Sequence, residues 1–319
     1  MRGFGIGFCE IGLALIAPAL LVANPAKSSE ALTTNQLADT LSFVDLDTMK
    51  SVAEIKIGGK PAGIALSPDK GRAYIAAPDG QELIEVDANA RVVTRRLKLG
   101  GGPLGIAALP TKPEVYAADW YAHKIAVVDT GSLTVAGEIQ VGLSPSGLAV
   151  TPDGTLLLSA DRDSDQVSII SITERKVLAT VPVGKRPFGV TISGDGKTAY
   201  TANVASDDVS VIDIAARKVT ATITSGHRPY AVALAAGWGF VTGQYSGTID
   251  VFDAKTHQPF SKIDACDHPE GIEANPAGTQ IYAACWGDNV LLKIDAATLK
   301  ITGKAATGDG PRAFGKFLR

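Results

Sequence analysis

The chain has 319 residues, a net charge of −3 at pH 7 and 45% hydrophobic residues. This composition excludes an intrinsically disordered chain, which would carry fewer apolar residues and a larger net charge. The weak negative charge also argues against a general nucleic-acid-binding protein, because such proteins present a strongly basic face. The length fits two domains of ordinary size or one large β domain.

The amino terminus predicts an export signal. Arg2 precedes an apolar run of 13 residues, 11–23, which is shorter than the about 20 residues of a spanning helix. Cleavage is expected near Ala23 or Ser28, so residues 1–28 are a signal peptide and residues 29–319 the mature protein. An uncleaved anchor is the alternative reading. No later stretch could span a membrane, and we expect a soluble protein in the periplasm or outside the cell.

Two ladders of residues repeat along the mature chain. The first ladder consists of prolines with spacings of 42, 42, 42, 42, 40 and 42 residues, at Pro61, Pro103, Pro145, Pro187, Pro229, Pro269 and Pro311. Glycine or alanine stands two residues after each proline. The second ladder has the same spacings and consists of Asp45, Asp87, Asp129, Ser171, Asp213, Asp253 and Asp295.

Each repeat contains four short apolar runs separated by turn residues. In the fourth repeat these runs are Phe188–Ile192, Thr198–Ala202, Val209–Ile212 and Lys218–Ile223. They alternate apolar and polar residues and are rich in β-branched side chains, as strands are. A period of about 40–45 residues with four strands is one blade of a β-propeller.

The two ends of the chain predict how the ring closes. The seventh repeat supplies only an inner strand, from Pro311 to Phe317, before the chain stops at Arg319. The missing three strands are expected near residues 32–35, 41–46 and 51–57. Closure of this kind pairs edges that an open sheet would expose. The sequence therefore predicts one all-β domain, a seven-bladed propeller closed by one C-terminal and three N-terminal strands.

These repeats resemble the YVTN β-propeller repeat family, including YncE-like exported proteins. The resemblance covers the mature chain and rests on units such as Arg186–Val190, Ala199–Asn203, Val209–Asp213 and Lys218–Ile223. It implies a periplasmic, mostly non-enzymatic binding or accessory protein. Some relatives accompany periplasmic quinoprotein oxidation systems or handle metals. Propellers serve many roles, so function must be argued from the site.

Residues that depart from the repeat are the candidates for function. Cys266 replaces a glycine, and Cys285 replaces the Asn or Asp found at its place in four other repeats. Both fall at the same end of the sixth blade, and export favours a disulfide between them. A soft metal pair and two inert buried thiols are the alternatives.

The loop before each inner strand and the loop after each second strand should share one face, because strands alternate direction. Cationic and aromatic side chains gather there and could bind an anion between apolar walls. The candidate ligand-binding residues are Lys60, Trp120, Tyr121, Arg162, Arg186, His227, Arg228, Tyr230, Tyr245, His268, Glu270, Trp286 and Arg312. In the competing interpretation the arginines pair with Asp119, Asp161 and Asp163 and merely tie the blades together.

The sequence supports a metal site or a catalytic site less well than an anion-binding site. His123, His227 and His268 fall on the predicted face with Asp267, Glu270 and Cys285, but their spacing forms no compact metal motif. A serine-nucleophile elbow, a phosphate loop and a haem-attachment motif are all missing from the sequence. We therefore assign no catalytic or metal residue, and the sequence identifies no cofactor.

The resulting hypothesis is an exported propeller that binds a small anionic ligand, or a segment of a periplasmic partner protein, without catalysis. The alternatives are a metal- or haem-handling propeller and a lactonase-like hydrolase.

Overall fold

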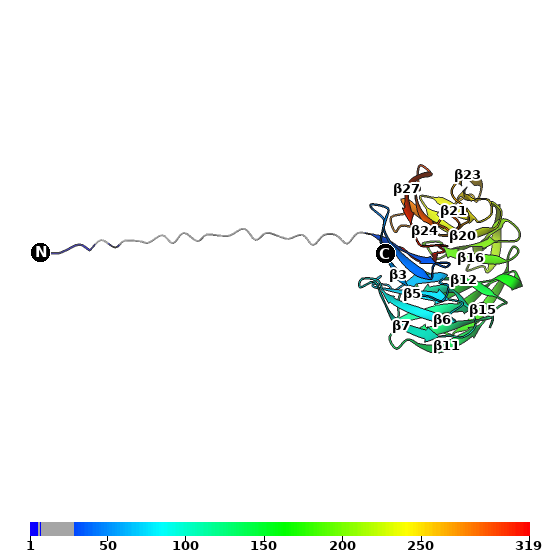
Figure 1. Cartoon of the computed structure of the whole chain (residues 1–319), viewed down its shortest axis with the longest axis horizontal. Helices are drawn as coiled ribbons and strands as arrows, with labels where there is room; N and C mark the ends of the chain where they lie inside the picture. Colours follow the sequence, from blue (N-terminus) through cyan, green and yellow to red (C-terminus); the bar gives the residue numbers. More distant parts are fainter. Residues whose placement is uncertain (6, 8–28) are drawn as a thin grey trace.

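The computed structural model describes residues 1–5, 7 and 29–319. The apolar run 11–23, Cys9 and both expected cleavage sites lie outside these residues. From residue 29 onward the chain forms the predicted ring of β-sheets, in which the C-terminus lies beside the first strands (Figure 1). The described part of the chain has a single helical turn, η1 (Arg162–Ser164), and so no helix there could cross a membrane.

Six blades are four-stranded antiparallel sheets of consecutive strands, numbered from the axis outward. Their strands are β4 (Gly63–Leu66), β5 (Arg72–Ala77), β6 (Glu82–Asp87) and β7 (Val92–Lys98); β8 (Pro103–Ala108), β9 (Glu114–Asp119), β10 (Lys124–Asp129) and β11 (Thr134–Gln140); β12 (Pro145–Val150), β13 (Leu156–Asp161), β14 (Gln166–Ser171) and β15 (Lys176–Pro182); β16 (Pro187–Ile192), β17 (Thr198–Asn203), β18 (Asp208–Asp213) and β19 (Lys218–Thr224); β20 (Pro229–Ala235), β21 (Trp238–Gly243), β22 (Thr248–Asp253) and β23 (Pro259–Asp264); and β24 (Pro269–Ala274), β25 (Gln280–Cys285), β26 (Val290–Asp295) and β27 (Lys300–Ala306).

The seventh blade combines both ends of the chain, as predicted. It contains β1 (Glu30–Asn35), β2 (Thr40–Asp45) and β3 (Lys50–Lys56). The C-terminal segment 311–319 runs antiparallel to β1 through bridges at Asn35–Pro311 and Ala31–Leu318. Within that segment β28 (Phe314–Gly315) also pairs in parallel with β4 of blade one. The ring is therefore closed by backbone hydrogen bonds from the last residues of the chain.

A buried ion cluster fastens this closure. The Glu30 carboxylate, on β1, accepts hydrogen bonds from Arg319 Nε at 2.7 Å and from Arg91 Nη2 at 2.6 Å. The side chains of Glu30 and Arg319 are only 6% and 5% exposed. One carboxylate thus joins the first strand, the last residue and the outer turn of blade one.

The repeated Asp and Gly positions have separate structural reasons. Asp295 Oδ1 accepts hydrogen bonds from the amides of Ala297 and Thr298, which fixes the turn between the third and fourth strands. The Thr298 amide is the main reason that the pKa of Asp295 lies below its ordinary value. Glycine stands at the start of inner strands because a Cβ on Gly105 would overlap the carbonyl oxygen of Ser146 in the next blade. Blades meet so closely near the axis that a side chain has no room there.

Candidate functional site

The two loops predicted to share one face do meet there. In six blades the backbone amide after the second strand donates a hydrogen bond to the carbonyl of the residue that precedes the inner-strand proline. Examples are Val204 to Arg186 and Trp286 to His268, at 3.0 and 2.9 Å. These paired loops form one end of the channel, which we call the rim.

Two arginines of the rim share one carboxylate. Arg162 Nη1 lies 2.7 Å and Arg186 Nε 3.9 Å from Asp163 Oδ1. Burial is the main cause that lowers the pKa of Arg162, and the positive charges of Arg186 and Arg228 add to it. Arg162 also lies over the Trp120 ring, 5.2 Å from its centroid. Two of the three guanidinium groups thus share Asp163, while Asp165 and Asp207 interact with the charges of Arg186 and Arg228.

A row of aromatic rings continues from this cluster along the rim. The Arg228 guanidinium lies 4.4 Å from the centroid of the Tyr245 ring, and its buried Nε has no hydrogen-bond partner among the described residues. Tyr245 is 55% exposed and stands between His227 and His268, with ring centroids at 5.8 and 5.3 Å. Trp286 follows at 6.0 Å from His268. Exposed Tyr245 therefore presents a flat surface flanked by an arginine and two imidazoles.

The rim cations occupy left-handed backbone, as Ser144 does at the same place in blade three with φ 53°. Lys60, Arg186, Arg228 and His268, each directly before an inner-strand proline, have φ values of 52–54°. Glycine adopts this left-handed region at least cost, and a non-glycine residue there is strained. Gly310 occupies the equivalent place in the seventh blade, with φ 66°. Four blades thus carry a cationic or imidazole side chain where the backbone favours glycine.

A third ladder, which the sequence analysis missed, supports these residues. Asp39, Asp165 and Asp207 accept hydrogen bonds at 2.8–2.9 Å from the amides of the residues 21 positions later, Lys60, Arg186 and Arg228. His123 has the same role, since its Nδ1 accepts a hydrogen bond from the Ser144 amide at 3.1 Å. Their spacing of 42 residues or a multiple of it is the signal that could have revealed them.

Glu270, Arg312 and Tyr230 form a buried group rather than an open wall. Arg312 Nε donates to Glu270 Oε2 at 2.7 Å, and Gln244 Nε2 donates to Glu270 Oε1 at 2.6 Å. Glu270 is 2% and Tyr230 4% exposed. Burial alone would lower the pKa of Arg312, but Tyr230 and Glu270 outweigh it and raise that pKa. The charge of Arg312 is thus matched inside the protein.

Below this group, aromatic rings close the channel. Phe188 of blade four lies 4.3 Å from Tyr230 and 4.9 Å from Phe314, between ring centroids, and 6.3 Å from Trp120. Phe314 belongs to the C-terminal segment, three blades further around the ring, so its contact with Phe188 crosses the axis. We call Trp120, Phe188, Tyr230 and Phe314 the aromatic plug. The sequence analysis did not single out Phe314.

Two predicted residues stand apart from these clusters. Lys60 Nζ donates to the Leu37 carbonyl and to Asp39 Oδ2, at 3.1 and 3.2 Å. Tyr121 is 72% exposed, and its ring covers the backbone of Gly102 in its own blade. Both residues lie on rim loops, but their contacts are local.

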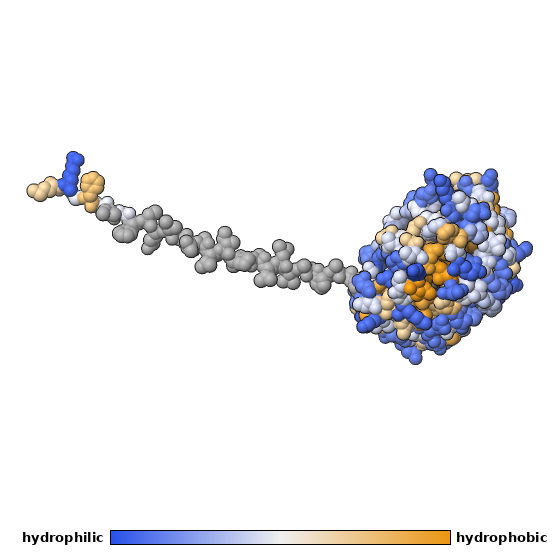
Figure 2. Space-filling model, turned by 90° about the horizontal axis from the view of Figure 1, so that it is seen from above, coloured by the Kyte–Doolittle hydropathy of each residue, from blue (hydrophilic) through white to orange (hydrophobic). Residues whose placement is uncertain are grey.

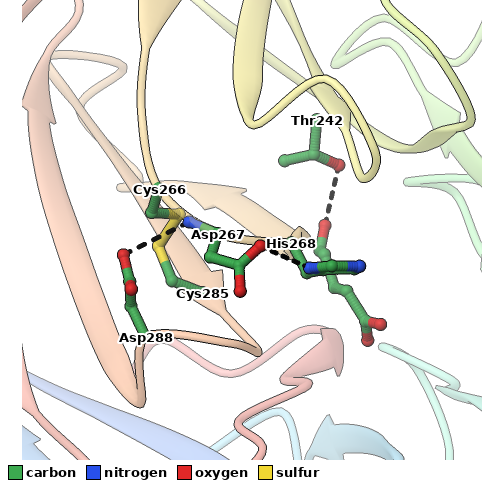
Figure 3. Close-up of a disulfide and its surroundings, with 7 residues drawn as sticks. Thr242, Cys266, Asp267, His268, Cys285 and Asp288 are labelled. Carbon is green, nitrogen blue, oxygen red and sulfur yellow. Dashed lines mark hydrogen bonds and ion pairs between the residues drawn. A yellow bond between two sulfur atoms is a disulfide. The ribbon is translucent and has the colours of Figure 1, made fainter.

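The predicted disulfide is present between Cys266 and Cys285, with a Cα–Cα distance of 5.9 Å (Figure 3). It lies beside the Asp267–His268 pair, in which His268 Nδ1 and Asp267 Oδ1 are 2.6 Å apart. Cys285 is fully buried among the apolar side chains of Val290 and Leu292. The bond therefore anchors the loop that carries His268 to the rim.

The competing interpretation of the arginines holds only for Asp163. Asp119 accepts hydrogen bonds from the amides of Gly102 and Tyr121. Asp161 is fully buried and accepts hydrogen bonds from the Gly142 amide and from Ser168. These two carboxylates organise their own loops. Burial raises the pKa of Asp161, and its hydrogen bonds offset part of that effect.

The described residues contain no group of three His, Cys, Asp or Glu side chains that could hold a metal ion. The imidazoles of the rim contact carboxylates singly, as His227 does with Asp207 at 3.0 Å. Cys285, which the metal alternative would use, is held in the disulfide.

No protein-family model matches this chain, and no curated protein sequence is similar to it. Several solved structures share its fold. Hydrazine synthase from Kuenenia stuttgartiensis is similar with a TM-score of 0.75 and 19% identity, over 83% of this chain and 91% of that one. A functionally unknown protein from Desulfotomaculum acetoxidans DSM 771 has a TM-score of 0.75 and 14% identity, over 89% and 99%. Dihydro-heme d1 dehydrogenase NirN in complex with DHE has a TM-score of 0.70 and 15% identity, over 96% and 77%. At these identities the similarity establishes the propeller fold alone.

Proposed function

We propose that this protein is an exported propeller of the YVTN-repeat type, which binds a small anionic ligand through its rim without catalysing a reaction. The signal-like amino terminus and the Cys266–Cys285 disulfide support export, because disulfides persist in oxidising compartments. Residues 1–28 are then the signal peptide and residues 29–319 the mature propeller.

One observation carries the proposal: Arg162 and Arg186 share the Asp163 carboxylate, at 2.7 and 3.9 Å, and the charge of Arg228 acts on Arg162 as well. The Arg186 side chain stays 56% exposed beside the shared carboxylate, so its guanidinium is open to a ligand. Planar guanidinium groups recognise carboxylate or phosphate by paired hydrogen bonds.

An exposed aromatic ring supports the same conclusion. The exposed Tyr245 ring beside Arg228 favours a ligand that combines negative charge with a flat apolar surface.

Benzene-1,3,5-tricarboxylate is a suitable probe because it is planar and carries three carboxylates. We expect calorimetry at low ionic strength to detect its binding. The double variant Arg186→Gly, Arg228→Gly removes both cations and relieves the strained φ, so binding should weaken at least about tenfold without loss of fold. Unaltered affinity in this variant would refute the proposal.

Two further variants serve as controls. Arg217→Ala removes an exposed arginine from the turn between β18 and β19, at the opposite end of the channel, and should leave binding unchanged. Asp163→Asn removes the counter-charge that Arg162 and Arg186 share and should strengthen binding. A weaker affinity in Asp163→Asn would contradict the idea that this carboxylate competes with the ligand.

A haem-type ligand is the second candidate. NirN, which shares the fold, was solved in complex with DHE. Here the His227 and His268 rings flank exposed Tyr245 beside Arg228, and could approach a flat ligand that carries carboxylates. The visible spectrum of protein purified from its own host tests this candidate. A Soret band that is lost in His268→Ala would favour it over a colourless anion.

A further inference from the structure

A cavity opens at the end of the channel opposite the rim. It has a volume of about 450 Å³ and is lined by the ends of β8, β12, β16, β20 and β24 and by the C-terminal segment. Its mouth lies at the turns that follow the inner strands, near Pro110, Pro152 and Gly194. Cavities of about 300–1,000 Å³ are typical of small-molecule sites.

Phe314 separates this cavity from the rim. Its ring belongs both to the cavity lining and to the aromatic plug, where it contacts Phe188 and Tyr230. A ligand in the cavity would therefore be screened from the rim arginines. The two ends of the channel can bind different molecules independently.

The lining is mainly apolar. Val150, Ile192 and Leu234 belong to it and remain partly exposed although they are large hydrophobic residues at strand ends. An apolar patch surrounded by hydrophilic residues is visible at the centre of the face shown in Figure 2. Burying apolar surface in such a cavity contributes about 25 cal/mol per Å².

One carboxylate stands in this apolar wall. Glu273 is 8% exposed, and its Oε2 accepts hydrogen bonds from the amides of Phe317 and Leu318 at 2.6 and 2.9 Å. Its Oε1 faces a different partner, Lys316 Nζ, at the longer distance of 3.5 Å. The Lys316 side chain is 75% exposed, and pairs with such an exposed lysine contribute little.

We propose that this cavity binds an apolar amine, whose ammonium group replaces Lys316 at Glu273 Oε1. The two backbone amides keep Glu273 in place, so the carboxylate is positioned before the ligand arrives. An apolar acid would bring a second carboxylate beside Glu273 in a nearly buried position, which is unfavourable. An apolar alcohol would fill the cavity but gain no ion pair.

Three probes of equal chain length test the proposal: octylammonium, 1-octanol and octanoate, each measured by calorimetry with the mature protein. We expect octylammonium to bind at least about tenfold more tightly than 1-octanol, the effect of one charge-assisted hydrogen bond. Octanoate should bind most weakly. Equal affinity for all three probes, or a preference for octanoate, would overturn the proposal.

Two variants locate the binding. Gly194→Trp should abolish octylammonium binding, because the indole would block the mouth of the cavity. A Cβ at Gly194 meets open space, so the substitution does not disturb the turn. Gly194→Ser is the matched control and should bind normally. Glu273→Gln retains an acceptor for the two amides and should reduce octylammonium to the affinity of 1-octanol.

Binding that survives Gly194→Trp but disappears in Arg186→Gly, Arg228→Gly would place the ligand at the rim and refute the cavity site. Near-ultraviolet circular dichroism of each variant checks that the fold is intact. If Glu273→Gln does not fold, the ranking of the three probes on the unaltered protein still decides.

Discussion

Loss of the Cys266–Cys285 bond should destabilise the propeller by a predictable amount. The bond links residues 19 positions apart in sequence, and it restricts the unfolded chain by closing that loop. The chain-entropy relation gives about 3 kcal/mol for a loop of this length. In blade three the equivalent junction is held by a hydrogen bond from the Gly142 amide to Asp161 at 3.0 Å, which contributes about 1 kcal/mol.

Urea unfolding of the oxidised and the reduced protein measures this difference without changing any side-chain volume. We expect the free energy of unfolding to fall by about 3 kcal/mol on reduction. The variant Cys266→Ser should show the reduced value under both conditions, which controls for effects of the reductant. A difference below about 1 kcal/mol would refute the loop argument. Blade six would then be held by apolar packing of Cys285 against Val290 and Leu292.

Three further predictions concern the scaffold. Burial raises the folded-state pKa of Asp161 above the ordinary 3.8, so its contribution to stability is present at low pH and is lost as pH rises through the raised value. Asp161→Asn should therefore gain stability relative to the unaltered protein as pH rises from 4 to 7, measured by urea unfolding; a constant difference would contradict this. Arg319→Ala leaves buried Glu30 with one fewer partner and should lower the free energy of unfolding by about 2 kcal/mol. An unchanged urea midpoint would show that the ion cluster at Glu30 does not stabilise the closure. Gly105→Ala must push apart two inner strands and should cost about 3 kcal/mol or more, while Gly194→Ala, in open space, should leave the melting temperature unchanged.

The architecture could be predicted because the repeat encodes it several times over. Most blades repeat the turn carboxylate and the inner-strand glycine, so a departure such as Ser171 or Ala231 does not obscure the period. The closure was predictable for the same reason, since an incomplete seventh repeat leaves a single place for the N-terminal strands. The strands of blade four were predicted to within one residue, as Thr198–Asn203 and Lys218–Thr224 show. Repetition, rather than local propensity, carries this information.

The rim was harder to predict because its residues are distinguished by what partners them. Arg186 and Arg312 look alike in sequence, but Arg186 is 56% exposed beside a shared carboxylate, whereas Arg312 is held by buried Glu270. Likewise, Tyr230 is buried in the aromatic plug, whereas Tyr245 is exposed on the rim. The repeat predicts at which end of the channel a residue lies. Whether its charge is neutralised depends on side chains of neighbouring blades. A single sequence does not show which side chains of two blades come into contact.

The cavity opposite the rim could not be predicted from residues that depart from the repeat. Its apolar lining consists of ordinary inner-strand residues, such as Val150 and Ile192, which every blade supplies in some form. The distinguishing residue is Glu273, and its role depends on the C-terminal segment that folds back against it. The same chain closure that completes the ring thus delivers Phe314 to the plug and orients a carboxylate in the cavity. The C-terminal segment 311–319 therefore both closes the ring and separates the two sites. A variant that loosens this segment should weaken binding at the rim and in the cavity together.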